Sequence, residues 1–130
     1  MNIYVIKPNF VSPDGMYFMK ERVMKEYPDA EIMENQSGPS YDPTMITKAN
    51  LLCVCIDKTH IIGKGVYDEY MTAKLREIPV RVFEYDTQLR ELNEFDNHDV
   101  KIIDTNNYRR YGIIYNVSNF DVMNSPNTLT

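Results

Sequence analysis

The chain has 130 residues, of which 43% are hydrophobic and 25% charged, with a net charge of −5. This length suits one domain with one hydrophobic core. The acidic balance excludes broad binding to a nucleic-acid polymer, which depends on many Lys and Arg contacts to phosphates. No run approaches the roughly 18 apolar residues of a membrane helix, and the first residues lack a secretory pattern. We therefore expect a cytoplasmic protein that contacts no membrane.

The first third of the chain alternates apolar runs with helix signals. A buried strand is expected over residues 3–6. Ser12 then caps a helix that begins at Pro13 and ends before Pro28, with Met and Val side chains spaced to face a sheet. A short second strand is expected over residues 30–33. Strand, helix and strand in this order indicate a βαβ unit.

The middle of the chain continues this alternation. Asp42, with a proline after it, predicts a short helix that runs to about Ala49. A strand is expected over residues 51–56, a helix over 63–77 and a strand over 79–83. Such alternation indicates a parallel sheet with helices on both faces. The predicted fold class is α/β, a small Rossmann-like (flavodoxin-like) parallel sheet.

In the last third of the chain the signals weaken. A helical turn is expected over residues 87–92, and short strands over 101–103 and 112–117. We interpret residues 1–120 as a single domain and residues 121–130 as a flexible C-terminal tail.

The two cysteines, Cys53 and Cys55, stand two apart in one expected strand. They share a face of the sheet, where extended geometry does not let them bridge, so we expect buried thiols. His60 and His98 show no spacing typical of metal ligands. Neither a metal nor a cofactor is expected.

A glutamate stands near the start of the helix expected over residues 63–77, between two small residues. Gly65, Glu69 and Ala73 recur every four residues and so share one stripe of the helix, which leaves room for a ring beside the carboxylate. The loop before such a helix lies beyond the carboxyl ends of the strands, where open α/β sheets bind ligands. The stripe favours a ligand-facing Glu69, with an exposed helical glutamate as the alternative.

Several motifs follow one another along residues 3–83. Residues 3–10 join an apolar strand to a loop with Pro and Phe. Asp42 precedes Asn50 by eight residues, ahead of the next apolar strand. The helical stripe matches a Gly-Thr-x-x-Glu-x-x-x-Ala pattern. In this order the motifs resemble the nucleoside 2-deoxyribosyltransferase-like family, which includes deoxynucleoside 5′-monophosphate N-glycosidases.

The resemblance implies cleavage or base exchange at the N-glycosidic bond of a deoxynucleoside or deoxynucleoside 5′-monophosphate. Glu69 would be the nucleophile, and Asp42 the acid that holds and protonates the departing base. The helix start should keep Glu69 ionised, whereas Asp42 would need partial burial to keep a proton. The residues expected to bind substrate are Tyr4, Pro8, Asn9, Phe10, Asp57, Gly63, Lys64 and Gly65.

The ligand contacts leave alternatives open. Tyr4 and Phe10 either stack on a base or belong to the core. In a monophosphate hydrolase, Lys58, Lys64 or the free amides of the helix start would hold the phosphate, and a transferase needs no such cations.

Other functions also stay open. The glycine-rich loop overlaps that of lysine-decarboxylase-like phosphoribohydrolases, although Ile61 and Ile62 stand where that group has a proline and a glycine. Gly63 replaces an aspartate of the deoxyribosyltransferase-like pattern, so a binding protein that sequesters a nucleotide-derived ligand is an alternative. An interaction module with an incidental pocket is a third.

We expect a homodimer or higher homo-oligomer, because a small sheet with an aromatic helix face leaves apolar surface to cover. The Tyr and Arg cluster at residues 108–111 is interpreted either as a solvated turn or as a contact to a neighbouring subunit.

Overall fold

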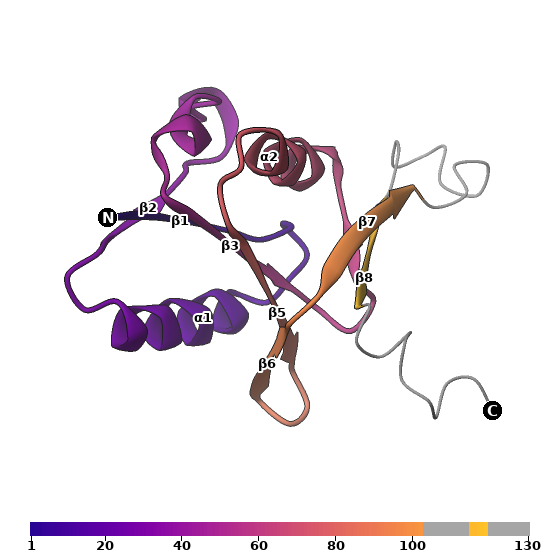
Figure 1. The fold of residues 1–130 in the computed structure, drawn as a ribbon. Helices are drawn as coiled ribbons and strands as arrows, with labels where there is room; N and C mark the ends of the chain where they lie inside the picture. Colours follow the sequence, from indigo (N-terminus) through magenta and orange to yellow (C-terminus); the bar gives the residue numbers. More distant parts are fainter. Residues whose placement is uncertain (103–114, 120–130) are drawn as a thin grey trace.

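In the computed structural model, which describes residues 1–102 and 115–119, the chain forms an α/β fold around a five-stranded sheet (Figure 1). The strand order is β2-β1-β3-β5-β6, and the first four strands in this order are parallel, whereas β6 is antiparallel to β5. The predicted fold class, a small Rossmann-like sheet, is confirmed. The strands are β1 (Asn2–Ile6), β2 (Glu31–Glu34), β3 (Leu51–Ile56), β5 (Val80–Asp86) and β6 (Glu91–Phe95).

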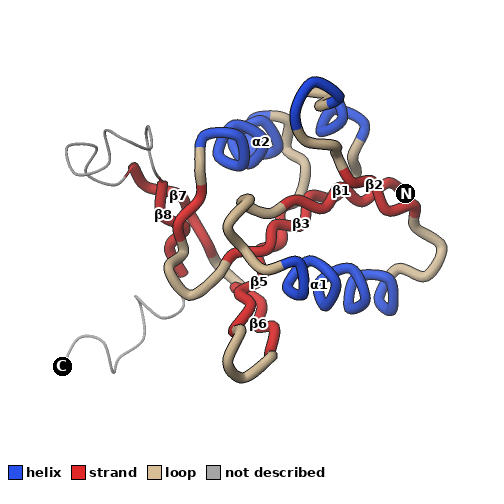
Figure 2. The backbone as a smooth tube through the Cα atoms, turned by 180° about the vertical axis from the view of Figure 1, so that it is seen from behind, coloured by secondary structure: helices blue, strands red, loops and turns tan. Residues whose placement is uncertain are grey.

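Helices cover both faces of this sheet, α1 (Pro13–Glu26) on one side and α2 (Lys64–Leu75) on the other (Figures 1 and 2). β3 is buried along its whole length, and its side chains point alternately to the two helices. The core therefore has two layers. Cys53 and Cys55 pack with the α1 layer, and Leu52, Val54 and Ile56 pack with the α2 layer.

The start of α1 follows the predicted signals. Pro13 occupies the first turn, and the Ser12 hydroxyl accepts a hydrogen bond from the amide of Asp14 at 3.2 Å. In the same turn Gly15 lies close to the sheet, because a Cβ added there would be 2.9 Å from Cys55 Sγ and 3.1 Å from Tyr85 Cβ. The absence of a side chain at Gly15 thus lets α1 approach the strands.

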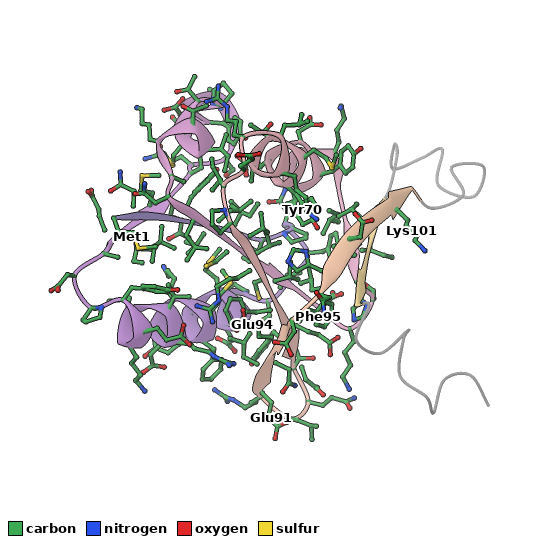
Figure 3. The ribbon with its side chains drawn as sticks, in the orientation of Figure 1. Met1, Tyr70, Glu91, Glu94, Phe95 and Lys101 are labelled. Carbon is green, nitrogen blue, oxygen red and sulfur yellow. The ribbon has the colours of Figure 1, made fainter. Side chains whose placement is uncertain are left out.

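A second, three-stranded sheet of order β4-β8-β7 lies beside α2. It consists of the antiparallel strands β4 (Ile61–Ile62), β7 (His98–Ile102) and β8 (Tyr115–Asn119). Figure 3 shows Tyr70 between α2 and β7, where its hydroxyl lies 2.7 Å from Nδ1 of His98. His98 Nε2 in turn donates to the carbonyl of Val80 at 3.0 Å. His98 thus links both sheets to α2 as a neutral ring whose Nδ1 accepts from Tyr70.

Three local predictions are wrong. The helix predicted from Asp42 to Ala49 is only a 3-10 helix at Met45–Lys48, because the Asp42 side chain closes a turn onto the Thr44 amide instead of starting a helix. The helical turn predicted over residues 87–92 is the hairpin between β5 and β6. There the Asp86 carboxylate accepts the amides of Gln88 and Leu89, and Arg90 adopts a φ of 54°. The predicted loop before α2 contains β4.

The late strands are present with shifted bounds. β7 begins at His98, three residues before the predicted strand, and β8 covers residues 115–119. The predicted tail and the cluster at residues 108–111 lie outside the described residues. Within residues 1–102 and 115–119, no helix has both the length and the apolar character that crossing a bilayer requires.

Gly15→Ala should destabilise the fold by about 1–3 kcal/mol, because the new methyl group overpacks the contact between α1 and the sheet. Gly65→Ala is the matched control, since a Cβ there meets no atom within 4 Å. Urea unfolding of both variants measures the difference. Equal stabilities would contradict the close approach of α1.

Burial lowers the pKa of His98 from its ordinary value of 6.5, and Lys74 contributes in the same direction. Since the unfolded chain then binds the proton more readily, stability should be full above about pH 6.5 and fall as the pH drops toward the lower folded pKa. Thermal unfolding as a function of pH measures this fall. His98→Gln should flatten it, and an equal fall in that variant would contradict the assignment to His98.

Candidate functional site

An open cavity of about 720 Å³ lies at the carboxyl ends of β1 and β2, beside the first turn of α2. Its walls are formed by residues 4–10, residues 34–38, Tyr41 and the start of α2, together with Met16. The chain leaves β1 toward β2 on one side and returns to β3 on the other, so the strand order reverses beside β1. Open α/β sheets bind ligands in the crevice at such a reversal.

Glu69 lies on the second turn of α2 and is only 7% exposed, yet it lines this cavity. Its Oε1 accepts hydrogen bonds from the hydroxyl of Tyr4 at 2.6 Å and from the hydroxyl of Tyr41. An oxygen that accepts two phenol protons carries no proton of its own. Both bonds made by the described residues end on Oε1, which leaves Oε2 for a ligand.

The two phenols are held neutral by their surroundings. Burial raises the pKa of Tyr4 and of Tyr41 far above the ordinary value for tyrosine, and the adjacent Glu69 carboxylate raises it further. They therefore donate protons in hydrogen bonds without adding charge. Two neutral donors thus fix one oxygen of Glu69 in place.

Asp42 does not line the cavity. Its Oδ1 accepts the amide of Thr44 at 2.9 Å and the hydroxyl of Thr44 at 2.6 Å. These bonds hold the pKa of Asp42 below its ordinary value, so as placed it is ionised at neutral pH. The structure thus does not bring together the two carboxyl groups that the sequence predicts as partners.

The cations named from the sequence are paired with carboxylates and lie outside the cavity lining. Lys58 and Lys64 pair with Asp86 and Asp68 respectively, at 2.7 and 3.2 Å. His60 Nε2 lies 2.5 Å from Glu84 Oε2, also outside the lining. Instead Lys7, the residue after β1, is the one cation among the described lining residues.

Of the other residues predicted to bind substrate, some line the cavity and some lie outside it. Phe10 is 57% exposed and forms part of the wall. Gly63 and Gly65 border open space, because a Cβ added at either would meet no atom within 4 Å. Asp57 lies outside the lining, and its carboxylate accepts the amide of Thr59 at 2.9 Å. The predicted residues that line the cavity are Tyr4, Pro8, Asn9, Phe10, Gly63, Gly65 and Glu69.

Sequence reasoning missed Lys7, Asn35 and Tyr41. Lys7 adjoins the Pro and Phe loop, so its place after the first strand was a usable signal. Asn35 and Tyr41 lie on the segment after β2, whose path is set by hydrogen bonds between side chains and backbone. No local pattern predicts such a path.

Nowhere in the part of the chain that the structure describes do three or more His, Cys, Asp or Glu side chains gather in a way that would hold a metal ion. Comparisons of the chain with family models, curated proteins and solved structures find no match. Function is therefore inferred from the geometry of the cavity and from its chemistry.

Tyr4→Phe should lower the free energy of unfolding by about 1–2 kcal/mol, because it removes a buried hydrogen bond to a carboxylate. Tyr41→Phe should cost less, under about 1 kcal/mol, because Tyr41 is 41% exposed and water replaces its hydroxyl. Denaturant unfolding of the two variants measures both values. A larger loss for Tyr41→Phe would contradict this order.

Proposed function

We propose that this protein cleaves or exchanges the N-glycosidic bond of a deoxynucleoside or deoxynucleoside 5′-monophosphate, with Glu69 as the nucleophile. The observation that carries the proposal is a buried carboxylate with one oxygen held by two phenols and the other available in an open cavity. The cavity volume, about 720 Å³, falls within the range of small-molecule sites.

In the first step, a Glu69 oxygen bonds to the anomeric carbon and the bond from that carbon to the base nitrogen breaks. The electron pair leaves with the base, which takes up a proton. Water in a hydrolase, or a second base in a transferase, then displaces Glu69 and releases its own proton. The two phenols favour this second displacement, because they stabilise the charge that returns to the carboxylate.

The cavity walls offer contacts for the rest of the ligand. Phe10 presents an exposed ring on which a base stacks, and Asn9 lies beside it. A 5′-phosphate would be held by Lys7 and by the amides at the start of α2, next to Gly65.

The alternative is a protein that binds a nucleotide-derived ligand without turning it over. It is favoured by Asp42, which accepts hydrogen bonds from Thr44 outside the cavity and holds no proton to deliver. Catalysis with Asp42 as the acid would require its side chain to turn away from Thr44.

The expected homo-oligomer stays a prediction.

The test is to incubate the pure protein with deoxynucleosides and deoxynucleoside 5′-monophosphates and to follow free base by chromatography. Glu69→Gln should slow release by at least about 100-fold, because it removes the nucleophile while keeping the side-chain shape. Glu91→Gln, at the exposed start of β6 (Figure 3), is the matched control and should leave release unchanged. If Asp42 is the acid, Asp42→Asn should also slow release.

The outcomes separate the functions. Release that depends on Glu69 supports the enzyme. Calorimetric binding of a nucleoside or nucleotide without release supports the sequestering protein. If neither release nor binding is observed, both of these functions are ruled out and an interaction module is favoured.

A further inference from the structure

Asn35 follows β2 directly and uses every hydrogen-bonding position of its side-chain amide. Its Oδ1 accepts the amides of Gln36 at 3.0 Å and Asp42 at 2.9 Å. Its Nδ2 donates to the carbonyl of Asp42 at 2.7 Å and to the hydroxyl oxygen of Tyr4 at 3.0 Å. A side-chain amide has two donors and two acceptor positions, so none is left over.

These partners fix which way the amide group points. The two backbone amides are donors only, so the atom that faces them must be the oxygen. The nitrogen therefore faces Tyr4 and must donate to its hydroxyl oxygen. Because a phenol has a single proton, the proton of Tyr4 is directed to Oε1 of Glu69, 2.6 Å away.

Asn35 also places the second phenol. It binds both the amide and the carbonyl of Asp42, the residue directly after Tyr41, and so fixes the backbone that carries this tyrosine. Tyr41 in turn donates to the same Oε1. One side chain thus controls both hydrogen bonds to Glu69 without touching Glu69 itself.

We propose that Asn35 is a positioning residue that fixes the direction of the Tyr4 hydrogen bond and the place of Tyr41, so that Glu69 meets its ligand with only Oε2 available. This inference rests on the proposed function for its effect on turnover. Its structural part, the coupling of Asn35 to Glu69 through Tyr4, stands independently of any reaction.

The decisive variant is Asn35→Asp, which keeps the shape and still accepts the amides of Gln36 and Asp42. Its second oxygen has no proton to donate, so the proton of Tyr4 is shared between two carboxylates. In a Glu69→Gln background this competition is relieved, because only one carboxylate remains beside Tyr4. The repulsion from the Asp42 carbonyl is the same in both backgrounds and cancels in the double-mutant cycle.

Asn35→Asp should lower Tm in both backgrounds. The fall should be at least about 3 °C smaller in the Glu69→Gln background than in the native one. Asn93→Asp, exposed on β6, is the matched control for the added charge and should show no such difference. Equal falls in both backgrounds would overturn the coupling. If N35D does not fold, N35S takes its place in a cycle with Tyr4→Phe, where its fall in Tm should be smaller than in the native background, because a phenylalanine has no hydroxyl oxygen to accept the Asn35 bond, and equal falls would overturn the coupling.

The kinetic readout separates positioning from a merely structural role. N35D should lower kcat by at least about tenfold and leave KM within about twofold, because the ligand still binds while the nucleophile is misdirected. In a Tyr4→Phe background, the further decrease in kcat caused by N35D should be much smaller. A rise in KM with unchanged kcat would overturn the positioning role.

The two proposals fail in different ways. Thermal coupling without any base release would support the role of Asn35 and refute the proposed reaction. Base release that depends on Glu69 but shows no coupling to Asn35 would support the reaction and refute the positioning role.

Discussion

Burial of the Glu69 carboxylate is the constraint on which the site depends. An ionised group that leaves water is costly unless hydrogen bonds replace its hydration. Here two neutral phenols donate to the carboxylate and replace part of that hydration. Tyr4 belongs to β1, Tyr41 to the segment after β2 and Glu69 to α2. The bonds that make burial tolerable therefore also hold three separate parts of the fold together.

Local signals were enough to predict the framework. The start of α1 could be predicted because Ser12 and Pro13 act within one turn of the chain. β3 could be predicted because a strand covered on both faces is apolar throughout. Glu69 could be selected because helical spacing sets it between small residues, and its burial on α2 agrees with that choice. Each of these features is decided by residues close in sequence.

The rest depends on partners far away in the chain. Tyr4 and Glu69 are separated by 65 positions, and Tyr41 and Glu69 by 28, so no local pattern relates them. β4 has only two residues and exists because it pairs with β8. The proline after Asp42 predicts a helix start, yet the backbone of Asp42 is held by Asn35, seven residues earlier, on the segment after β2. Parallel strands bring such segments together at one edge of the sheet, and only the folded chain shows which side chains meet there.

The spacing along α2 bears on which ligand fits the proposed function. Gly65, at the open start of the helix, precedes Glu69 by four residues, a rise of about 6 Å along the helix axis. An anion at the helix start is stabilised by the free amides and by Lys7, whereas one beside Glu69 is repelled by the carboxylate. A suitable ligand therefore has its anionic group at the helix start and its reactive carbon beside Glu69. These two parts of the ligand lie about the length of a sugar apart. A deoxynucleoside 5′-monophosphate has this arrangement. Its phosphate would therefore orient the anomeric carbon toward Oε2, and the same helix would provide both the anchor and the nucleophile.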